Sequence, residues 1–277
     1  MNPRSFVKMH GLGNDFVVVD ARREPFVLDQ AAARAVADRR TGVGCDQLIV
    51  LEPPANGAAD VFMRIRNADG GEVEACGNAS RCVAALIMEE TGRDRCTVET
   101  QAGLLHAAAL RTGEIAVDMG ELRTAWRDIP LARQMDTLHL DLAYGPLRDP
   151  VAVNIGNPHA VFFVADVSAS DLASLGPQLE HDPLFPERAN IGVAQLVGPD
   201  RLRVRVWERG VGLTRACGTG ACAAAAAAHR RGLTGRKVEV RLDGGPLAVE
   251  WREDGHMVMT GPVATSFTGV FADSLLP

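Results

Sequence analysis

A short pattern occurs twice in this chain of 277 residues, namely Ala-Cys-Gly followed by a small polar residue. It reads "ACGN" at 75–78 and "ACGT" at 216–219. Three further pairs of similar stretches occur in the same order. The four offsets are 143, 148, 141 and 141 residues, so the sequence predicts two copies of one structural unit. The other pairs are "GNDFVVV" around Asn14 with "GNPHAVFF" around Asn157, "GVGCDQL" (42–48) with "NIGVAQL" (190–196), and "RIRN" ending at Asn67 with "RVWE" ending at Glu208.

The hydrophobic pattern predicts the secondary structure of each copy. Many short runs alternate apolar with polar residues, as half-buried antiparallel strands do. Examples are "RLRVRVWE" (201–208) and "KVEVRL" (237–242). The fold class predicted is α/β (α+β), with two pseudo-symmetric domains of mostly antiparallel strands, each wrapped around a central helix that begins at a cysteine. Helices are expected over 29–40, 76–91, 168–179 and 217–231.

The chain length suits two domains of ordinary size. The segment "GELRTAWRDIPLARQ" (120–134) contains a proline and has no clear hydrophobic period, which favours a linker. We therefore expect one domain over 1–122 and a second over 123–264.

Composition limits the function classes. The chain is 47% apolar and 23% charged with a net charge of -6, which favours neither nucleic acid nor an anionic membrane as partner. It contains no apolar run near the ~20 residues of a membrane span, and its start does not resemble a signal peptide. We therefore expect a cytoplasmic protein with reduced thiols.

The sequence favours neither a cofactor nor a metal. Lys8 and Lys237 are its two lysines, and neither has a phosphate-binding loop beside it for pyridoxal phosphate. The glycine-rich stretches lack the third glycine of G-x-G-x-x-G, and the clustered His and Cys spacing of zinc sites is missing. The expected cofactor set is therefore empty, and no metal is expected.

Each cysteine turn has the chemistry of an anion site. The backbone N–H groups at a helix start favour a carboxylate, and Gly77 and Gly218 let a ligand approach them closely. The same positive end of a helix lowers the pKa of a thiol, so we expect Cys76 or Cys217 to titrate below the ~8.5 of a free cysteine.

Two such turns facing each other would form a two-base racemase or epimerase. One thiolate would remove a proton from a carbon, and the other thiol would deliver one to the opposite face. Two other interpretations stay open, namely buried structural cysteines and a thiol-disulfide redox protein, although C-x-x-C is missing. The remaining cysteines, Cys45, Cys82, Cys96 and Cys222, are expected in the core.

Five motifs resemble the diaminopimelate epimerase family: "KMHGLGNDFVVVD", "GVGCDQ", "NADGGEVEACGNASRC", "NIGNPHAVFF" and "WERGVGLTRACGTGACA". The match runs from residue 8 to about 225. The resemblance implies conversion of LL-2,6-diaminopimelate to the meso form without pyridoxal phosphate or metal, in lysine and peptidoglycan precursor synthesis. It also implies a homodimer, and a tail over 265–277 that returns to the first domain. Another racemase of the same fold, such as proline racemase, is the alternative within this class.

The resemblance assigns roles to individual residues. Cys76 and Cys217 match the two catalytic cysteines, while His159 and Glu208 match positions that tune their pKa values. The substrate-binding positions are Asn14, Gln47, Asn67, Gly77, Asn78, Asn157, Asn190, Glu208, Arg209, Gly218 and Thr219.

Residue chemistry agrees with these roles but does not require them. The fork of Arg209 suits a carboxylate and Glu208 suits an ammonium group. Asn14 and Asn157 lie beside glycine and could equally be turn residues, and His159 could be an ordinary strand histidine. Five positions depart from the family pattern, and we expect them to affect loop closure or helix packing: Arg66, Ala75, Leu213 and the pair Ala79-Ser80.

Overall fold

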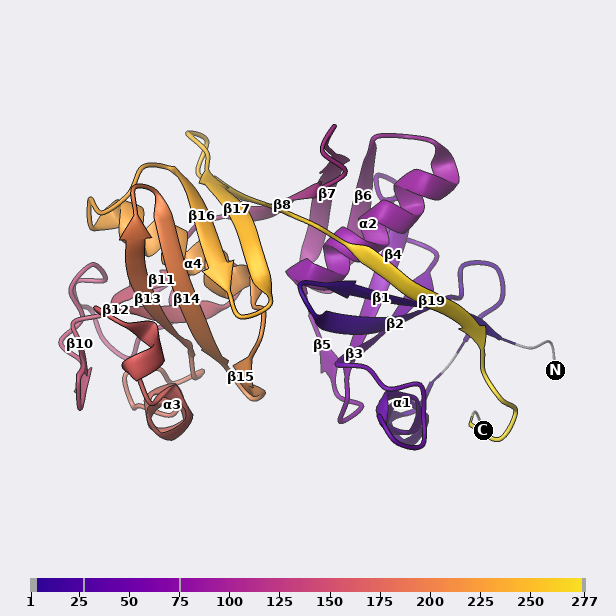
Figure 1. Cartoon of the computed structure of the whole chain (residues 1–277), viewed down its shortest axis with the longest axis horizontal. Helices are drawn as coiled ribbons and strands as arrows, with labels where there is room; N and C mark the ends of the chain where they lie inside the picture. Colours follow the sequence, from indigo (N-terminus) through magenta and orange to yellow (C-terminus); the bar gives the residue numbers. More distant parts are fainter. Residues whose placement is uncertain (1–3, 27, 75, 276–277) are drawn as a thin grey trace. The chain divides into compact units, whose positions relative to one another are not determined.

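The computed structural model describes residues 4–26, 28–74 and 76–275. The chain forms two compact units (Figure 1). The first unit contains Met1–Val117 and Gly261–Pro277, and the second contains Asp118–Thr260. The departure at Ala75 lies outside the described residues.

The first unit is a curved sheet with two helices. Its sheet order is β19-β1-β2-β3-β4-β6-β7-β8, with β5 paired to β4. The pairs β2–β3 and β4–β6 are parallel, and the others are antiparallel. The elements are β1 (Ser5–Gly11), β2 (Asn14–Asp20), α1 (Gln30–Ala37), β3 (Gln47–Glu52), β4 (Val61–Asn67), β5 (Glu72–Val73), α2 (Gly77–Thr91), β6 (Arg95–Thr100), β7 (Gly103–Ala109), β8 (Ile115–Glu121), which continues into the second unit, and β19 (Ala264–Val270).

The second unit repeats this arrangement. Its sheet order is β11-β12-β13-β14-β16-β17-β18, with β15 paired to β14. Here β12–β13 and β14–β16 are the parallel pairs. The elements are β9 (Ala143–Tyr144), β10 (Leu147–Arg148), β11 (Val151–Asn154), β12 (Pro158–Phe163), η1 (Val167–Ala169), α3 (Leu172–Glu180), β13 (Asn190–Gly198), β14 (Arg201–Glu208), β15 (Gly212–Thr214), α4 (Gly218–Arg230), β16 (Lys237–Leu242), β17 (Gly245–Trp251) and β18 (His256–Gly261).

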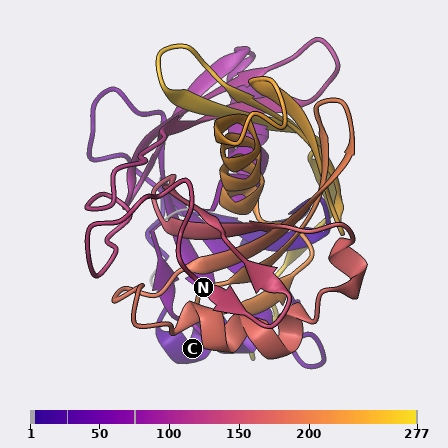
Figure 2. The same ribbon diagram turned by 90° about the vertical axis from the view of Figure 1, so that its left-hand side faces the viewer.

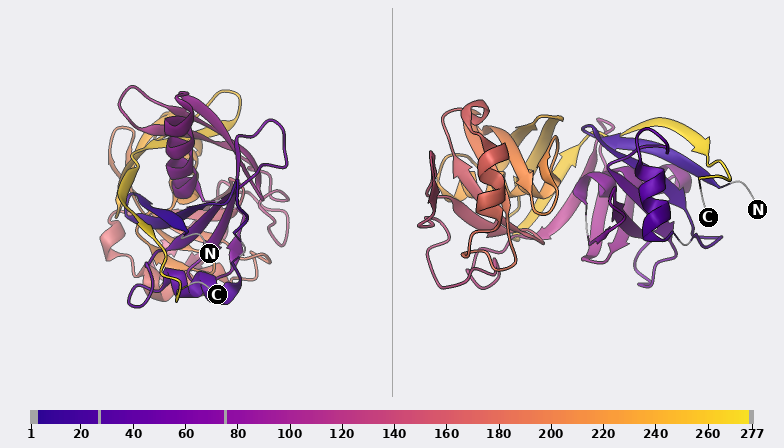
Figure 3. Two further views of the ribbon diagram at one scale, coloured as in Figure 1. Left: turned by 90° about the vertical axis from the view of Figure 1, so that its right-hand side faces the viewer. Right: turned by 90° about the horizontal axis from the view of Figure 1, so that it is seen from below.

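Each sheet curves around one helix. In the first unit α2 contacts β1, β2, β4, β6 and β7, and Figure 3 shows it inside their curve. In the second unit α4 is enclosed by β11 to β14, β16 and β17 (Figure 2). The run 223–228 of α4 is all alanine and fully or almost fully buried, so small side chains let the strands approach the helix closely. The predicted fold class is confirmed.

Strand register defines the repeat residue by residue. In the first unit Phe16 of β2 lies opposite Gln47 of β3. In the second, His159 of β12 lies opposite Asn190 of β13. Phe16 and His159 are 143 positions apart, and so are Gln47 and Asn190. Asn190 is therefore the counterpart of Gln47 in the second unit. The sequence match with an offset of 148 was wrong at this station, because it aligned two glutamines that hold different places in the sheet.

The cores of the two units are built in the same way. Helix α1 buries Ala33 and Val36 against β2 and β3, and its first turn is capped by Asp29, which accepts a hydrogen bond from Ala32 N–H at 2.7 Å. Helix α3 buries Leu172 and Leu179 against β12 and β13.

Most predicted elements agree with the structure within a few residues, but several strands had no prediction, among them β7, β13 and β19. Of these, β13 carries the candidate residue Asn190. The segment 120–134 is not an exposed linker, because Ile129 and Leu131 are buried in the core of the second unit. The domain boundaries at 122 and 264 stay a prediction. Among the residues described, no helix is long and apolar enough to cross a membrane.

Candidate active site

A tight turn places the first polar residue of the site. Gly11 and Asn14 pair across the hairpin of β1 and β2, which leaves Leu12 and Gly13 as a two-residue loop. Their φ angles are 57° and 79°, as a type I′ turn requires. Asn14 thus begins β2, and its side-chain amide donates a hydrogen bond to Asp46 Oδ2 at 3.0 Å.

Asn14 connects this hairpin to the start of α2. Cys76 is the N-cap residue, with extended backbone angles of -148° and 109°. Its thiol lies 3.9 Å from Asn14 Oδ1, and the same oxygen accepts a hydrogen bond from Asn78 Nδ2 at 3.1 Å. Arg81, which is fully buried, donates to Asn78 Oδ1 at 2.8 Å. Asn14 therefore sits directly against the thiol, and a chain of hydrogen bonds from inside the helix holds it there.

Charged residues behind Asn14 fix its strand. Asp15 forms ion pairs of 2.6 Å with buried Lys8 and with Arg39. Arg39 also pairs with Asp46 at 2.7 Å. Burial raises the pKa of Asp15, but the hydrogen bonds from Arg39 and Lys8 outweigh it and hold that pKa below its usual range. Lys8 thus has a structural partner.

Gln47 and Asn67 complete the first half-site, by which we mean Asn14, Gln47, Asn67, Cys76, Gly77 and Asn78. Gln47 and Asn67 lie opposite each other on β3 and β4. Gln47 Nε2 donates to Asn67 Oδ1 at 2.9 Å, while Gln47 Oε1 is buried without a hydrogen-bond partner in the described structure. That oxygen is available to a ligand donor.

In the second unit, amides surround a buried histidine. His159 is fully buried, and its Nε2 lies 2.8 Å from Asn157 Oδ1. Asn190 Nδ2 donates to the Pro158 carbonyl at 3.0 Å and lies 3.5 Å from His159 Nε2. Burial and the nearby charge of Arg209 lower the pKa of His159 to about 3, so its imidazole is neutral at neutral pH.

The start of α4 presents the second thiol. Cys217 is the N-cap residue and is 4% exposed. Its Sγ accepts a hydrogen bond from Gly220 N–H at 3.3 Å and lies 3.5 Å from Thr219 Oγ1. A Cβ at position 220 would come within 2.7 Å of a methyl group of Val206, so only glycine fits this turn.

The environment of Cys217 favours the protonated thiol. Burial raises its pKa well above the usual value, and the Glu208 carboxylate raises it further through its charge and a hydrogen bond. The donors Thr219 and Gly220 lower it by less. Of the two cysteines, Cys217 is therefore not the one expected to titrate below a free thiol.

A turn between β14 and β15 carries Glu208 and Arg209. Val211 N–H closes it by donating to the Glu208 carbonyl at 3.0 Å, and Thr214 Oγ1 donates to the Glu208 carboxylate. Arg209 N–H donates to Asn190 Oδ1 at 2.9 Å, and its guanidinium donates to the Glu187 carbonyl at 2.9 Å. The structure thus brings together the second half-site: Asn157, His159, Asn190, Glu208, Arg209, Cys217, Gly218 and Thr219.

The other cysteines agree with the prediction that they belong to the core. Burial raises the pKa of Cys45 and Cys96 to about 11 and that of Cys82 to about 12. Cys222 is fully buried in α4. All six cysteines are thiols. Because Cys82 holds its proton, it is poorly suited to exchange a disulfide with Cys76.

The departures from the family pattern have local structural roles. Arg66 pairs with Glu72 at 2.7 Å across the β4–β5 hairpin. Ala79 and Ser80 are buried in the first turn of α2, where Ser80 Oγ donates to the Cys76 carbonyl at 2.9 Å. Leu213 of β15 lies opposite Trp207 of β14 and is exposed.

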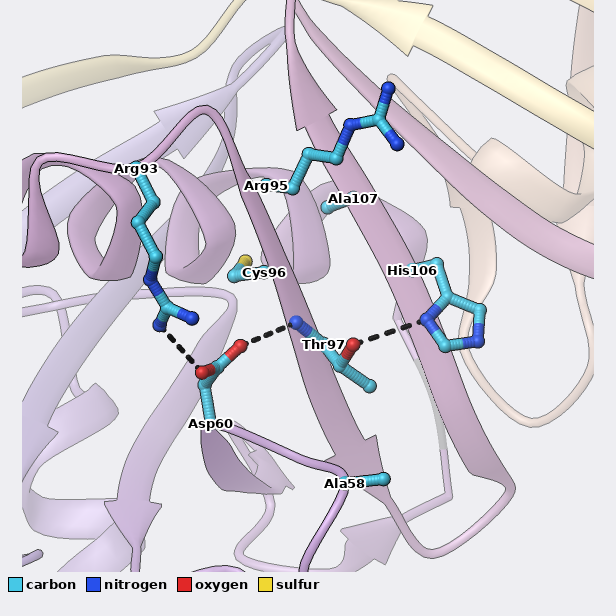
Figure 4. Close-up of a pocket in the computed structure, with 8 residues that line it drawn as sticks. All are labelled: Ala58, Asp60, Arg93, Arg95, Cys96, Thr97, His106 and Ala107. Atoms are coloured by element: carbon cyan, nitrogen blue, oxygen red, sulfur yellow. Dashed lines mark hydrogen bonds and ion pairs between the residues drawn. The ribbon is translucent and has the colours of Figure 1, made fainter.

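A pocket of about 370 Å³ lies elsewhere in the first unit, against β6 and β7 (Figure 4). Arg93 and Asp60 pair across it at 2.6 Å, and the other oxygen of Asp60 accepts from Thr97 N–H at 2.8 Å. Arg95 points away from this pair (Figure 4). These side chains satisfy one another, and the residues lining the pocket include none of the candidate residues. Among the residues described, no group of three His, Cys, Asp or Glu side chains could hold a metal ion.

Sequence reasoning missed the residues that hold the half-sites in place. Asp15 pairs with Lys8 and Arg39, and Asp46 pairs with Arg39, next to Asn14. Arg81 anchors Asn78. Asp46 follows the "GVGC" stretch and Arg81 follows Asn78 by three residues, one helical turn. That spacing was a usable signal.

Comparisons place the chain among known proteins. Over 98% of its length its fold resembles the structure of a probable proline racemase from Agrobacterium radiobacter K84, with a TM-score of 0.72, 17% sequence identity and 93% of that chain covered. At this identity the similarity establishes the fold that the chain shares with that structure.

Sequence comparison resolves the family. The profile described as Diaminopimelate epimerase matches residues 6–125 and 151–266. A diaminopimelate epimerase from Rhodospirillum centenum is 61% identical over 99% of this chain and 94% of its own length. One from Acidiphilium cryptum is 56% identical over 99% of this chain and 98% of its own. The chain belongs to the diaminopimelate epimerase family.

Proposed function

We propose that the chain is a cofactor-independent epimerase that converts LL-2,6-diaminopimelate to the meso form with Cys76 and Cys217 as its two bases. One observation carries the proposal: in each unit the central helix is capped by a cysteine, with hydrogen-bonding side chains around the thiol. Family membership supports the substrate.

The proposed reaction moves two protons. The Cys76 thiolate takes the α-proton, and the electron pair of the broken C–H bond stays on the α-carbon. The Cys217 thiol gives its proton to the opposite face, which leaves Cys76 as thiol and Cys217 as thiolate. N–H groups at the starts of α2 and α4, at Gly77, Asn78, Gly218 and Thr219, bind the adjacent carboxylate and stabilise the developing charge.

The electrostatics of the half-sites support this division of roles. Burial and Glu208 keep the proton on Cys217. Cys76 instead lies at a helix start, with the side-chain oxygen of Asn14 3.9 Å from its thiol, and a helix N-terminus favours a thiolate. The resting enzyme in this proposal therefore holds Cys76 as thiolate and Cys217 as thiol.

The distal end of the substrate is assigned to Arg209. Its guanidinium can bind a carboxylate bidentately, and Glu208 can accept from an ammonium group. The corresponding place in the first unit is Ala68, one residue after Asn67. One arginine of this kind suits a substrate that reacts at one end and is recognised at the other. Hydrogen bonds from the amides complete substrate binding in the proposal: Asn14, Gln47, Asn67, Asn157 and Asn190, with His159 holding Asn157.

The setting of the enzyme is proposed from its family. We place it in lysine and peptidoglycan precursor synthesis in the cytoplasm, as a homodimer. Residues 1–122 and 123–264 form the two functional domains, with the tail over 265–277 joined to the first. In support, Ser5 pairs with Val270 through β1 and β19.

The test is direct. Purified protein, treated with chelator and reductant and free of pyridoxal phosphate, is incubated with LL-diaminopimelate, and the stereoisomers are separated. Meso product is expected, and its absence would refute the proposal. L-Proline, which lacks a second amino-acid end, is the matched substrate: racemisation of proline instead would favour the alternative racemase of the same fold.

A further inference from the structure

A buried carboxylate holds the turn that presents Glu208 and Arg209. Glu180 is the last residue of α3 and is 3% exposed. One of its oxygens accepts the indole N–H of Trp207 at 2.8 Å, and the other accepts Gly210 N–H at 2.9 Å. These two donors lie immediately before and after Glu208 and Arg209 in the chain.

The geometry of the turn depends on these bonds. Gly210 has a φ of +73°, which glycine adopts at little cost, so its backbone has many alternatives in the absence of an anchor. A buried carboxylate is costly unless its hydrogen bonds are made, and here both oxygens are used. Arg188 adds an ion pair at 3.5 Å from its exposed side chain.

Packing fixes the same turn from a second side. A Cβ at Gly176 of α3 would come within 2.5 Å of the Trp207 ring, so the indole lies directly against the helix. Helix α3 therefore fixes the turn in two ways. Gly176 packs against the Trp207 ring, and Glu180 accepts hydrogen bonds from the indole N–H and from Gly210 N–H.

We propose that Glu180 is a positioning residue that aligns Arg209, and with it Glu208, for the substrate. The inference rests on the proposed function, since Arg209 is assigned there to the distal carboxylate. Glu180 itself touches no reacting atom. Its effect is carried by the turn between β14 and β15.

The main variant is Glu180→Gln, which keeps the size of the side chain. A glutamine offers one carbonyl oxygen, so one of the two donors loses its acceptor and faces an NH₂ group. We expect KM for LL-diaminopimelate to rise about tenfold, with a smaller change in kcat.

Two further variants keep this test interpretable. Glu99→Gln is the matched control, because Glu99 Oε2 also accepts two backbone N–H bonds, from Ala55 and Asn56 at 2.8 and 3.0 Å. It should leave KM unchanged. If Glu180→Gln does not fold, Trp207→Phe removes the indole donor, together with part of the ring, while keeping Glu180 and should raise KM in the same direction.

A double-mutant cycle with Arg209→Met separates positioning from general stability. If Glu180 acts through Arg209, Glu180→Gln should raise KM in the wild type and change it little in the Arg209→Met background. An equal effect in both backgrounds, or an unchanged KM in both Glu180→Gln and Trp207→Phe, would overturn the inference. A wild type without epimerase activity would instead refute the proposed function, so the two failures are distinguishable.

Discussion

The two half-sites have the same backbone arrangement but contain different charged residues. In the first unit Gln47 of β3 lies opposite Asn67 of β4. In the second unit Ile191 of β13 pairs with Trp207 of β14, and their chain neighbours Asn190 and Glu208 hold the corresponding places. The first half-site presents neutral amides around Cys76. The second contains a carboxylate, a guanidinium and a neutral imidazole around Cys217. A duplicated scaffold therefore surrounds its two thiols with different polar residues.

The supporting helices differ in the same way. Gln30 of α1 donates a side-chain hydrogen bond to the Asp69 carbonyl at 3.3 Å, in the turn after β4. Glu180 of α3 accepts two hydrogen bonds in the corresponding turn after β14. The helix contact to the turn that carries Arg209 is thus a buried carboxylate, whereas the helix contact to the turn that carries Ala68 is a neutral amide. The repeated backbone therefore fixes where the site residues lie, and the differences between the polar residues of the two copies give each half-site its own chemistry.

Removal of either thiol should have the largest effect. Cys76→Ala and Cys217→Ala should each reduce epimerisation by about a thousandfold or more, because half of the proton transfer is lost. Serine should be nearly as poor, since a hydroxyl seldom ionises near pH 7 without a dedicated base. Cys82→Ala and Cys222→Ala, on the same two helices, are the controls. Substantial activity in either alanine variant at 76 or 217 would show that the paired-thiol mechanism is wrong.

Loss of the distal arginine should come next. Arg209→Met removes the charge and keeps bulk, and kcat/KM should fall by an amount that corresponds to about 2–4 kcal/mol, as for a lost buried charge contact. Arg236→Met is the matched control, because Arg236 also donates to a backbone carbonyl, that of Trp251 at 3.2 Å. Steady-state kinetics with wild-type values for Arg209→Met would reduce this arginine to a structural role.

Neutralising Glu208 should make the two thiols more alike. Its carboxylate raises the pKa of Cys217, so Glu208→Gln should lower that pKa while kcat falls about tenfold to a hundredfold. The measurement is the rate of alkylation of Cys217 against pH in a Cys76→Ser background. An unchanged or higher titration midpoint would contradict the assigned asymmetry.

The smallest effect concerns stability in the second unit. The hydrogen bond from His256 to Asp118, at 2.9 Å, raises the pKa of His256 above its usual ~6.5. Its stabilising contribution is fully present below pH ~6.5 and is lost as the pH rises through the folded-state value. Because this imidazole is 42% exposed, the effect should stay under about 1 kcal/mol. Urea unfolding at pH 6 and pH 8 should show that His256→Gln removes this part of the pH dependence; an identical dependence in the variant would contradict it.

Much of the fold could be predicted from the sequence, because strand alternation and the helix-opening cysteines are local signals. The helix predicted over 76–91 is α2, and the strand predicted over 201–208 is β14. Strand β13 escaped prediction because its buried start "NIGVA" contains a glycine and lacks a clear alternation. The strand register was also predicted wrongly where Gln47 was matched with Gln195, because the two glutamines look equivalent in the sequence but hold different places in the sheet.

The site could be predicted only where a residue type carries the chemistry. Cysteine, arginine and glutamate at turns are visible in a sequence. The preference of Cys217 for its proton was not, because burial opposes the helix start and only the structure gives its extent. Glu180 was invisible for another reason: it lies 30 residues from Gly210, whose N–H it accepts.

Proton transfer in heavy water tests the central claim most directly. If the two thiols each serve one face of the α-carbon, a first turnover from LL-diaminopimelate should place solvent deuterium at the inverted carbon of the meso product, while the remaining LL substrate still carries protium. Mass spectrometry of the separated isomers gives both values. A meso product that retains the original hydrogen would show that a single base carries it between the faces and would contradict the account.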